Sequence, residues 1–492
     1  MVIAVAPEPS NMTASLTARQ GESQPPSRSM IRVFNHYFHT WTLRRMSFDF
    51  GLALLALAAV MVVQSSNLVD LAGLVPMAGP QVISLAAGMF VINTASGLYQ
   101  RTADRSLAES CLRALLALGL ALALTYQVFA LLPLSLANTA AVRVSAMLVI
   151  TMVIVRRVFV AHWSGEGRAG SRVLVFGTGP AAQMVGTTLR SADPLARIVG
   201  YFPGPNEKQC AVPGGECLGT TRSLTETARQ LGVDEIVVAL TERRSGSMPL
   251  RELLDCKLAG IRVYDITTYF ERMLGQIRID YVNAGWLIFG DGFNQGLVRT
   301  TVKRIFDIAC SAILIAVSAP IMLVAALAIK LESRGPVFYR QERVGLNSRP
   351  FLVTKFRSMR TDAEKDGKPV WAAAQDSRVT RVGQFIRRTR IDELPQLFNV
   401  LKGEMSLVGP RPERPYFVEQ LTQEIPYYAV RHSIKPGLTG WAQVKYQYGS
   451  TVEDSAEKLQ FDLYYVKNHS LVLDCVILVE TVGVVLTGKG AR

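Results

Sequence analysis

The sequence predicts a membrane protein that combines an α-helical part with an α/β part. Three observations support this fold class. They are uncharged apolar runs in the first third of the chain, alternating strands and helices in the middle, and a proline-containing apolar segment before the polar C-terminal motifs. A chain of 492 residues is longer than a single domain with one compact core, which favours several domains. The predicted parts are a disordered cytoplasmic N-terminus (1–47), four transmembrane helices (48–165), an α/β domain (171–290) and a mostly helical domain (301–492).

The membrane region consists of apolar runs that almost lack charge. The first three runs are each long enough to cross roughly 30 Å of hydrocarbon as a helix, whereas the fourth is shorter and contains Arg143. The candidate spans are Phe50–Val69, Leu71–Gln100, Ala114–Val142 and Thr139–Val155. A helical bundle inside a soluble protein is the alternative, but such helices carry a polar stripe that these runs lack. We therefore expect a multi-pass membrane region.

The distribution of basic residues predicts the orientation of these spans. Arginines precede the first run, separate the second from the third, and follow the fourth, whereas the loop 64–80 contains no Lys or Arg. Because basic loops stay in the cytoplasm, the N-terminus and everything after Arg156 are expected there. The net charge of +14 indicates anionic partners such as lipid headgroups or nucleotides. Nucleic acid is not expected as a partner, since most nucleic-acid binders lack several membrane-length segments.

The six cysteines are expected to be reduced and structural, which fits a cytoplasmic setting. They are Cys111, Cys210, Cys217, Cys256, Cys310 and Cys475. Cys210 and Cys217 share a Gly/Pro-rich loop, but no histidine lies near them to complete a zinc site.

The middle of the chain begins with a strand, a glycine-rich turn and a helix. Gly177-x-Gly179-x-x-Ala182 resembles the first turn of a dinucleotide-binding, Rossmann-like fold. Strands and helices then alternate, which is typical of a parallel sheet. Strands are expected at Val173–Phe176, Ile198–Phe202, Glu235–Leu240 and Arg262–Asp265, and helices at Leu224–Leu231 and Leu250–Leu258.

A working dinucleotide site is not expected in this domain. The acidic residue that would hold the ribose is missing from the second strand, which ends Val199-Gly200-Tyr201-Phe202. The glycines alone also suit a tight strand-to-helix turn. An NAD-dependent sugar-nucleotide epimerase would need a Tyr-x-x-x-Lys pair, which the domain lacks. A structural, regulatory or dimerising role is expected instead, which leaves a homodimer open.

A fifth apolar segment, over 303–332, is expected to enter the membrane without crossing it. Basic residues flank it on both sides, which contradicts a simple crossing. They are Lys303, Arg304, Lys330 and Arg334. Ser318 and Pro320 lie near its centre, where a proline removes a backbone donor and kinks a helix. A sharp bend would return this re-entrant helix to the same face, whereas the alternative, an ordinary kinked span, would carry the following residues outside.

Two adjacent carboxylates, Asp392 and Glu393, follow this segment among many arginines. Like charges this close repel each other, which favours neutralisation by Mg²⁺ or arginine. A carboxylate beside Mg²⁺ and arginines suits phosphoryl transfer, where charge on phosphate is the main obstacle. An aspartate can also attack phosphorus directly and form an acyl phosphate. A proline-clamped arginine, Pro410-Arg411-Pro412, follows and strengthens the functional interpretation over a solvated helix surface.

From Thr301 onward, the motifs resemble those of the bacterial polyprenyl-phosphate hexose-1-phosphate transferases, the initiating enzymes of exopolysaccharide and O-antigen synthesis. With its membrane region and α/β domain, the chain resembles the large form of that family over Phe48–Arg492. The motifs that carry the resemblance are Lys355-Phe356-Arg357-Ser358-Met359, Arg387–Leu397, Val408–Glu413, Lys435–Gln443 and Glu457–Tyr465.

The resemblance implies a two-step transfer at the cytoplasmic face of the bacterial inner membrane. Asp392 would attack the β-phosphate of a UDP-sugar, expel UMP and hold the sugar-1-phosphate covalently. The phosphate of undecaprenyl phosphate would then take over the sugar-phosphate, with Glu393 assisting through Mg²⁺, so that both carboxylates serve as metal ligands. Residues 301–492 would thus be the catalytic domain.

The resemblance also assigns substrate-binding positions. Arg387 matches the family position for the polyprenyl phosphate, and Pro410-Arg411-Pro412 matches the segment linked to uridine recognition. Lys355 and Arg357 are expected to contact phosphate. Ser318 and Pro320 match the position of the helix break. The chain departs from the family at Thr389-Arg390-Ile391, which adds a positive charge beside the carboxylates. A membrane-anchored sensor or scaffold that uses the α/β domain is the alternative, and it would not need Asp392.

Overall fold

The structure is a computed structural model. It describes mainly residues 171–192, 196–240, 248–360, 378–446 and 451–487, with a few positions omitted inside these ranges, most of 30–48, and scattered positions from 51 to 151. The four predicted spans lie outside the described residues apart from those scattered positions. The multi-pass membrane region therefore stays a prediction.

The α/β domain contains one four-stranded parallel sheet. Its strands are β3 (Arg172–Phe176), β4 (Arg197–Phe202), β5 (Glu235–Val238) and β6 (Arg262–Asp265), in the order β4-β3-β5-β6. The neighbours β3 and β5 are separated in sequence by β4, so the chain crosses over the sheet between them. The predicted parallel sheet is thus confirmed; the four strands overlap the predicted ranges, and β5 ends at Val238, two residues before the predicted end.

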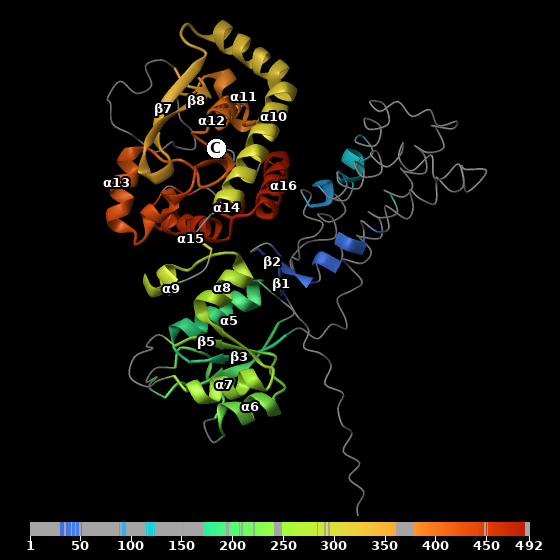
Figure 1. The fold of residues 1–492 in the computed structure, drawn as a ribbon, viewed down its shortest axis with the longest axis vertical. Helices are drawn as coiled ribbons and strands as arrows, with labels where there is room; N and C mark the ends of the chain where they lie inside the picture. The colour runs from blue at the N-terminus through green and yellow to red at the C-terminus, as the bar shows by residue number, and fades with distance from the viewer. Residues whose placement is uncertain are drawn as a thin grey trace, which may run out of the picture.

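Helices cover both faces of this sheet. The helices α5 (Pro180–Ala192) and α8 (Ile266–Leu274) lie on one face, and α6 (Leu224–Gln230) and α7 (Leu250–Leu258) on the other (Figure 1). Because successive strand side chains point to opposite faces, Val173 and Val175 pack with the first pair of helices, whereas Leu174 and Phe176 pack with the second. Burial on both faces explains the continuous apolar runs in these strands.

The apolar segment before the C-terminal motifs forms one long helix, α10 (Leu297–Glu332), with Pro320 inside it. The helix continues through the predicted break and changes direction in its second half (Figure 1). The hydroxyl of Ser318 donates to the carbonyl of Leu314 at 2.6 Å, so this side chain bonds back within the helix. Among the described residues, α10 is the one helix long and apolar enough to cross a membrane, and most of its apolar side chains are exposed.

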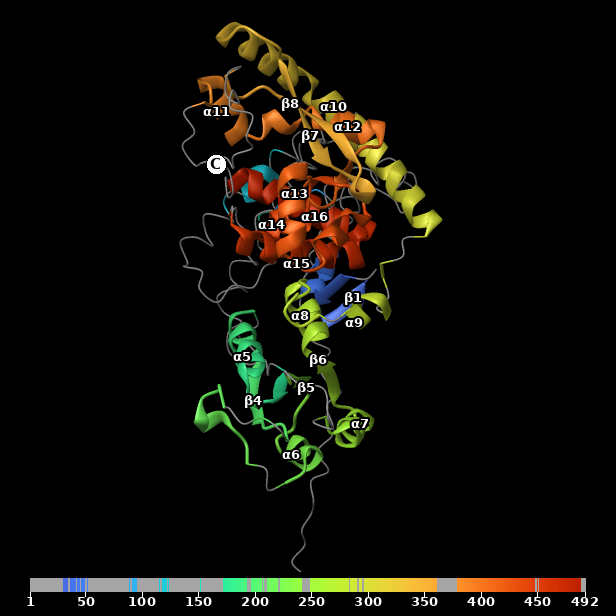
Figure 2. The same ribbon diagram turned by 90° about the vertical axis from the view of Figure 1, so that its left-hand side faces the viewer.

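Most of the C-terminal domain is helical. Its strands form a hairpin, β7 (Phe338–Val344) with β8 (Pro350–Phe356), and a short parallel pair, β9 (Ser406–Val408) with β10 (Gly437–Thr439). Its helices are α11 (Arg381–Arg388), α12 (Gln396–Lys402), α13 (Pro415–Glu424), α14 (Trp441–Lys445), α15 (Val452–Asn468) and α16 (Leu471–Thr487). The main core of buried apolar residues lies among α12, β9, α15 and α16. Figure 2 shows α13, α14, α15 and α16 gathered in one cluster.

Contacts made by α8 and by the residues that follow it join the α/β domain to the C-terminal domain. After α8, Ile277 and Val282 pack in the C-terminal core, and the predicted boundary at residue 290 stays a prediction. The carboxylate of Glu271 in α8 accepts from Lys467 at 2.8 Å, and the indole of Trp441 donates to the carbonyl of Gly275 at 2.7 Å. These buried polar contacts tie the α/β domain to α14 and α15.

The N-terminus contributes a hairpin to this junction. The strands β1 (Met30–Val33) and β2 (His36–His39) pair antiparallel, and the buried His36 ring lies 2.7 Å from the hydroxyl of Tyr464. The predicted disorder of residues 1–47 is therefore wrong for the hairpin. The partner of His36, Tyr464, lies more than four hundred residues away in the chain, and local composition does not register such contacts.

Candidate functional site

The carboxylate pair, Asp392 and Glu393, lies on a single 3₁₀ turn (Ile391–Glu393) between α11 and α12. Arg390 precedes the turn with a left-handed φ of 61°, which redirects the chain at the end of α11. Leu397 and Val400 on the next helix are buried in the C-terminal core and anchor the turn. The two carboxylates therefore lie on a short turn between two helices.

Glu393 is surrounded by cations from separate parts of the chain. Its Oε1 lies 3.0 Å from Lys355 Nζ on β8, 3.2 Å from Arg411 Nη2 after β9, and 3.8 Å from Arg390 Nη1. Burial opposes ionisation of this carboxyl, but the three cations outweigh burial and hold its pKa well below the usual range. Glu393 is therefore a fixed negative charge, and the positive side chains of the site lie around it.

Asp392 is in a different environment. Its side chain is buried, and its Oδ1 has no hydrogen-bond partner. Burial and the neighbouring Glu393 raise the pKa of Asp392 to about 6, against the opposing charges of Lys355, Arg387 and Arg390. A buried carboxylate oxygen without a partner is costly unless another group uses it. The two adjacent carboxylates thus have different properties, and Asp392 is the one with an unengaged oxygen.

Arg387 and Arg357 make contacts in two different places. Arg387, in the last turn of α11, donates from Nε to the hydroxyl of Ser358 at 2.8 Å, which orients its guanidinium. Arg357 is buried and donates to the carbonyls of Ser333 and Arg334 at 2.9 and 3.0 Å, where it caps the end of α10. The role of Arg357 as a phosphate contact stays a prediction, because its described bonds go to backbone and side-chain oxygens of that helix end.

The segment Pro410-Arg411-Pro412 is held by its backbone. The carbonyl of Pro410 accepts from the amide of Gly437 at 2.9 Å, and the carbonyl of Pro412 accepts from Arg343 at 3.1 Å. Between them, the side chain of Arg411 reaches Glu393. The prolines and these bonds fix the segment that carries this guanidinium to the carboxylate pair, a contact that the sequence motif alone did not indicate.

Sequence reasoning missed a buried ion pair behind this segment. Arg431 donates to the carbonyl of Arg411 at 2.9 Å, to the hydroxyl of Tyr428 at 2.7 Å and to the carboxylate of Asp462 at 2.8 Å. Both charged side chains are almost fully buried. The only signal in the sequence was Asp462, a carboxylate between Phe461 and Leu463. A charged residue within an apolar and aromatic stretch is rarely buried without a partner.

The carboxylate pair offers the hard oxygen ligands that Mg²⁺ prefers. Among the described residues, no group of three or more His, Cys, Asp or Glu could hold a metal. Mg²⁺ in phosphoryl-transfer sites usually takes one or two carboxylates and completes its shell with substrate phosphates and water. The unengaged Oδ1 of Asp392 fits such a ligand set, so Asp392 and Glu393 are the residues that would hold the ion.

The glycine-rich turn of the α/β domain is filled by a carboxylate of the same chain. Glu207 accepts hydrogen bonds from the backbone amides of Thr178, Gly179 and Gly204 and from the Thr178 hydroxyl, at 2.5 to 3.3 Å. The amides at the start of α5 are the donors that a phosphate would use in a dinucleotide fold. In this structure the carboxylate of Glu207 takes these donors, and the absence of a dinucleotide stays a prediction.

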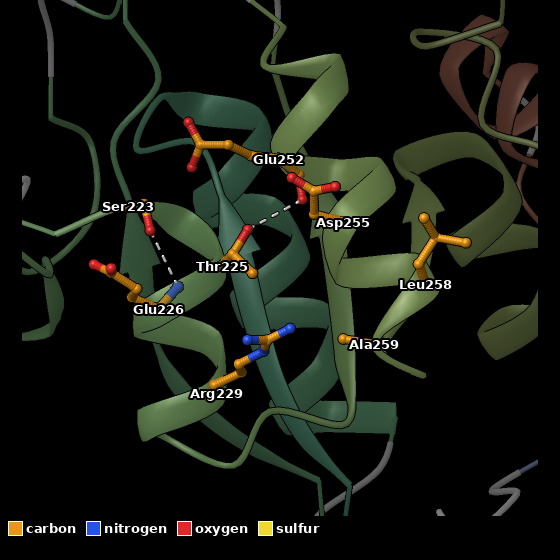
Figure 3. A pocket seen from close by; sticks show the side chains of 8 residues that line it. All are labelled: Ser223, Thr225, Glu226, Arg229, Glu252, Asp255, Leu258 and Ala259. Atoms are coloured by element: carbon orange, nitrogen blue, oxygen red, sulfur yellow. Dashed lines mark hydrogen bonds between the residues drawn. The ribbon is translucent and has the colours of Figure 1, made fainter.

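A shallow pocket of about 550 Å³ lies elsewhere in the α/β domain. It lies beside α6 and α7, and its side chains include Glu226, Arg229, Glu252 and Asp255 (Figure 3). Glu252 is already engaged, since its carboxylate accepts from the amide of Leu224 at 2.7 Å. The pocket contains neither member of the carboxylate pair.

Known proteins resemble the chain over both folded parts. A family profile described as bacterial sugar transferase matches residues 298–488, and one described as CoA-binding domain matches residues 94–249. Over 242 residues the chain is 46% identical to the UDP-N-acetylgalactosamine-undecaprenyl-phosphate N-acetylgalactosaminephosphotransferase of Aeromonas hydrophila, covering 49% of this chain and 56% of that protein.

Two glucose transferases match longer parts of the chain. The undecaprenyl-phosphate glucose phosphotransferase of Komagataeibacter xylinus is 35% identical, with 64% of this chain and 59% of that protein covered. The UDP-glucose:undecaprenyl-phosphate glucose-1-phosphate transferase of Xanthomonas campestris pv. campestris is 33% identical, with 68% and 70% covered. The chain spans less than two thirds of the Aeromonas and Komagataeibacter proteins. The sequence match and the matching C-terminal motifs together show that the chain belongs to the bacterial sugar transferase family.

Proposed function

We propose that this protein transfers a hexose-1-phosphate from a UDP-sugar to undecaprenyl phosphate, as the first membrane step of exopolysaccharide synthesis. The observation that carries the proposal is the division of roles within the carboxylate pair. Asp392 has a buried, unengaged oxygen, whereas Glu393 is held by Lys355 and Arg411. The relatives are named as undecaprenyl-phosphate phosphotransferases for N-acetylgalactosamine or glucose, which supports the reaction class and leaves the sugar open.

In the first step, an oxygen of Asp392 forms a bond to the β-phosphorus of the UDP-sugar. The bond from that phosphorus to the bridging oxygen breaks, and UMP leaves with the electron pair. The sugar-1-phosphate is then an acyl phosphate on Asp392. In the second step, a phosphate oxygen of undecaprenyl phosphate attacks the same phosphorus. The carboxylate of Asp392 leaves and is regenerated, and the product is a diphosphate-linked sugar.

The cations around the pair suit the charge that develops in both steps. Lys355, Arg390 and Arg411 lie within 4 Å of one oxygen of Glu393, so three positive side chains share one carboxylate. Preorganised cations of this kind stabilise a phosphoryl transition state. Arg387 adds a fourth cation whose charge acts on Asp392. When bound, Mg²⁺ supplies further neutralisation of the diphosphate.

We further propose that α10 is re-entrant and that the protein resides in the bacterial cytoplasmic membrane. Both ends of the helix bond to the same domain. Near its start, Arg304 donates to the carbonyls of Val400 and Leu401 at 2.6 Å, and at its end Glu332 accepts from the amide of Val382 at 3.1 Å. A helix with both ends on one folded domain has both ends on one side of the membrane. Its exposed apolar middle then lies in lipid beside an acceptor that is itself a lipid.

Cysteine labelling tests this topology. In a background without native cysteines, Leu297→Cys and Leu331→Cys mark the two exposed ends of α10, and Val317→Cys marks its exposed middle. An impermeant maleimide is expected to label both ends in inside-out vesicles and neither end in intact cells. Val317→Cys is expected to stay unlabelled from either side, because it is surrounded by lipid. Labelling of Leu331→Cys from outside the cell would show that α10 crosses the membrane.

UMP release tests the reaction itself. Purified full-length protein in detergent receives undecaprenyl phosphate, Mg²⁺ and, one at a time, UDP-glucose, UDP-galactose, UDP-N-acetylglucosamine or UDP-N-acetylgalactosamine. At least one donor is expected to give UMP and a lipid-linked sugar in equal amounts. Omission of Mg²⁺ with a chelator present is expected to stop both products. If no donor gives UMP, the membrane-anchored sensor or scaffold becomes the better interpretation of the chain.

A further inference from the structure

Two thiols of the α/β domain lie in contact. The sulfur atoms of Cys210 and Cys217 are 3.2 Å apart, and both cysteines are free. Cys210 is exposed and Cys217 is half-buried, so small molecules in solution can reach the pair. No hydrogen bond joins any of the other described cysteines to a second cysteine. Cys256, for example, is buried beside Thr225. The expectation that all six cysteines are merely structural does not account for an accessible pair.

The two thiols lie on a segment that contacts the glycine-rich turn. We call the described residues between 203 and 218 the strap. The amide of Ala211 donates to the carbonyl of Thr178 at 2.8 Å, and the amide of Leu218 donates to the carbonyl of Tyr201 at 2.8 Å. Glu207, also on the strap, accepts from the amides of the turn. The strap is therefore held to the turn at Ala211 and to β4 at Leu218, and the thiol pair beside these two residues links the two points.

We propose that Cys210 and Cys217 are a redox-active dithiol that closes to a disulfide and locks the strap over the glycine-rich turn. The co-reactant is a low-molecular-weight disulfide such as oxidised glutathione. The thiolate of Cys210 attacks it, one thiol leaves, and a mixed disulfide remains. Cys217 then loses its proton and attacks the Cys210 sulfur, releasing a second thiol. Two protein thiols are oxidised and one external disulfide is reduced.

The order of attack follows from the surroundings of the two sulfurs. Cys210 is the more exposed thiol, so it meets the oxidant first. Burial and the hydrogen bond with Cys210 raise the pKa of Cys217 to about 11, which makes it a poor first nucleophile. Cys217 is nevertheless placed to resolve the mixed disulfide, because its sulfur already touches the neighbouring one. Disulfides in a reducing compartment are usually transient and redox-sensing, which fits an exposed pair of this kind.

Mass spectrometry of the full-length protein tests the proposal. Native protein is exposed to oxidised glutathione, free thiols are alkylated, and the tryptic peptide 209–222, which contains both cysteines, is analysed. Most of this peptide is expected to lose two hydrogens and to escape alkylation. Closure is expected to be at least about tenfold faster than in the isolated peptide, because the fold has already brought the sulfurs together. Amide exchange at Thr178 and Ala211 is expected to slow by a similar factor.

Serine variants separate the alternatives. Cys210→Ser and Cys217→Ser should each abolish the internal disulfide, and the remaining cysteine should hold at most one glutathione. Cys256→Ser, a change outside the pair, should leave closure unchanged. Glutathione on both cysteines of the wild type, or closure no faster than in the peptide, would overturn the dithiol assignment. Rapid closure with unchanged amide exchange at Ala211 would overturn the lock on the strap.

Discussion

Asp392→Asn is expected to reduce UMP release by about 10³-fold or more, because an amide of the same shape cannot attack phosphorus. The buried site keeps its volume, so folding should be unaffected and the loss should appear in kcat. A covalent intermediate gives a second measurement. Without acceptor, wild-type protein given donor labelled in the β-phosphate should retain label after denaturation, whereas the Asp392→Asn variant should retain none.

Two variants control for this change. Glu393→Gln alters the neighbouring carboxylate but leaves the oxygens of Asp392, so slow labelling of the protein is expected to persist. Asp454→Asn alters a carboxylate outside the pair, in the first turn of α15, and should release UMP at the wild-type rate. If Asp392→Asn kept full activity, neither the nucleophile nor the assignment of the site to the carboxylate pair would survive.

The pH dependence of the reaction reports the same residue. Burial and Glu393 raise the pKa of Asp392 to about 6, and only the deprotonated carboxylate is a nucleophile. The value of kcat/KM should therefore fall about tenfold per pH unit below 6 and level off above it. Glu393→Gln removes a like charge and frees the cations bound to it, and both changes lower the pKa of Asp392. The acid limb of the profile should move to lower pH in this variant.

The α/β domain was predictable because its signals are local. Both faces of the parallel sheet are buried, so strands such as β3 and β5 read as short apolar runs bounded by turns. The hairpin Met30–His39 was not predictable, since its residues become ordered through Tyr464 at the other end of the chain. Local composition describes the conformational preference of a segment and not the partners that long-range folding brings to it.

The candidate site likewise combines features that local sequence predicts with features that depend on long-range contacts. Ordered motifs located Asp392 and Glu393, but they did not indicate which cations meet them. Lys355 and Arg411 come from different strands and loops, and their convergence on one oxygen of Glu393 depends on the tertiary fold. The difference in pKa between two adjacent carboxylates is likewise a property of the folded environment.

Asp462→Asn is expected to cost about 3–5 kcal/mol in the free energy of unfolding, because it leaves Arg431 charged and buried without its counter-ion. Burial raises the pKa of Asp462 to about 6, which is still low enough for the pair to be charged at neutral pH. Thermal unfolding in detergent should shift downward by about 10 °C. Asp454→Asn, which removes a capping carboxylate from the same helix, should cost only about 1 kcal/mol.

The pair also positions Arg411, and a double variant separates this effect from stability. Arg431→Met with Asp462→Leu replaces both charges by apolar side chains, which often restores the stability lost when one partner of a buried pair is removed. The carbonyl of Arg411 still loses its donor in this variant. KM for the UDP-sugar is therefore expected to stay raised although the unfolding temperature recovers. Recovery of both quantities would mean that Arg431 stabilises the fold without positioning Arg411, whereas recovery of stability alone identifies the buried ion pair as the support of the guanidinium that reaches Glu393.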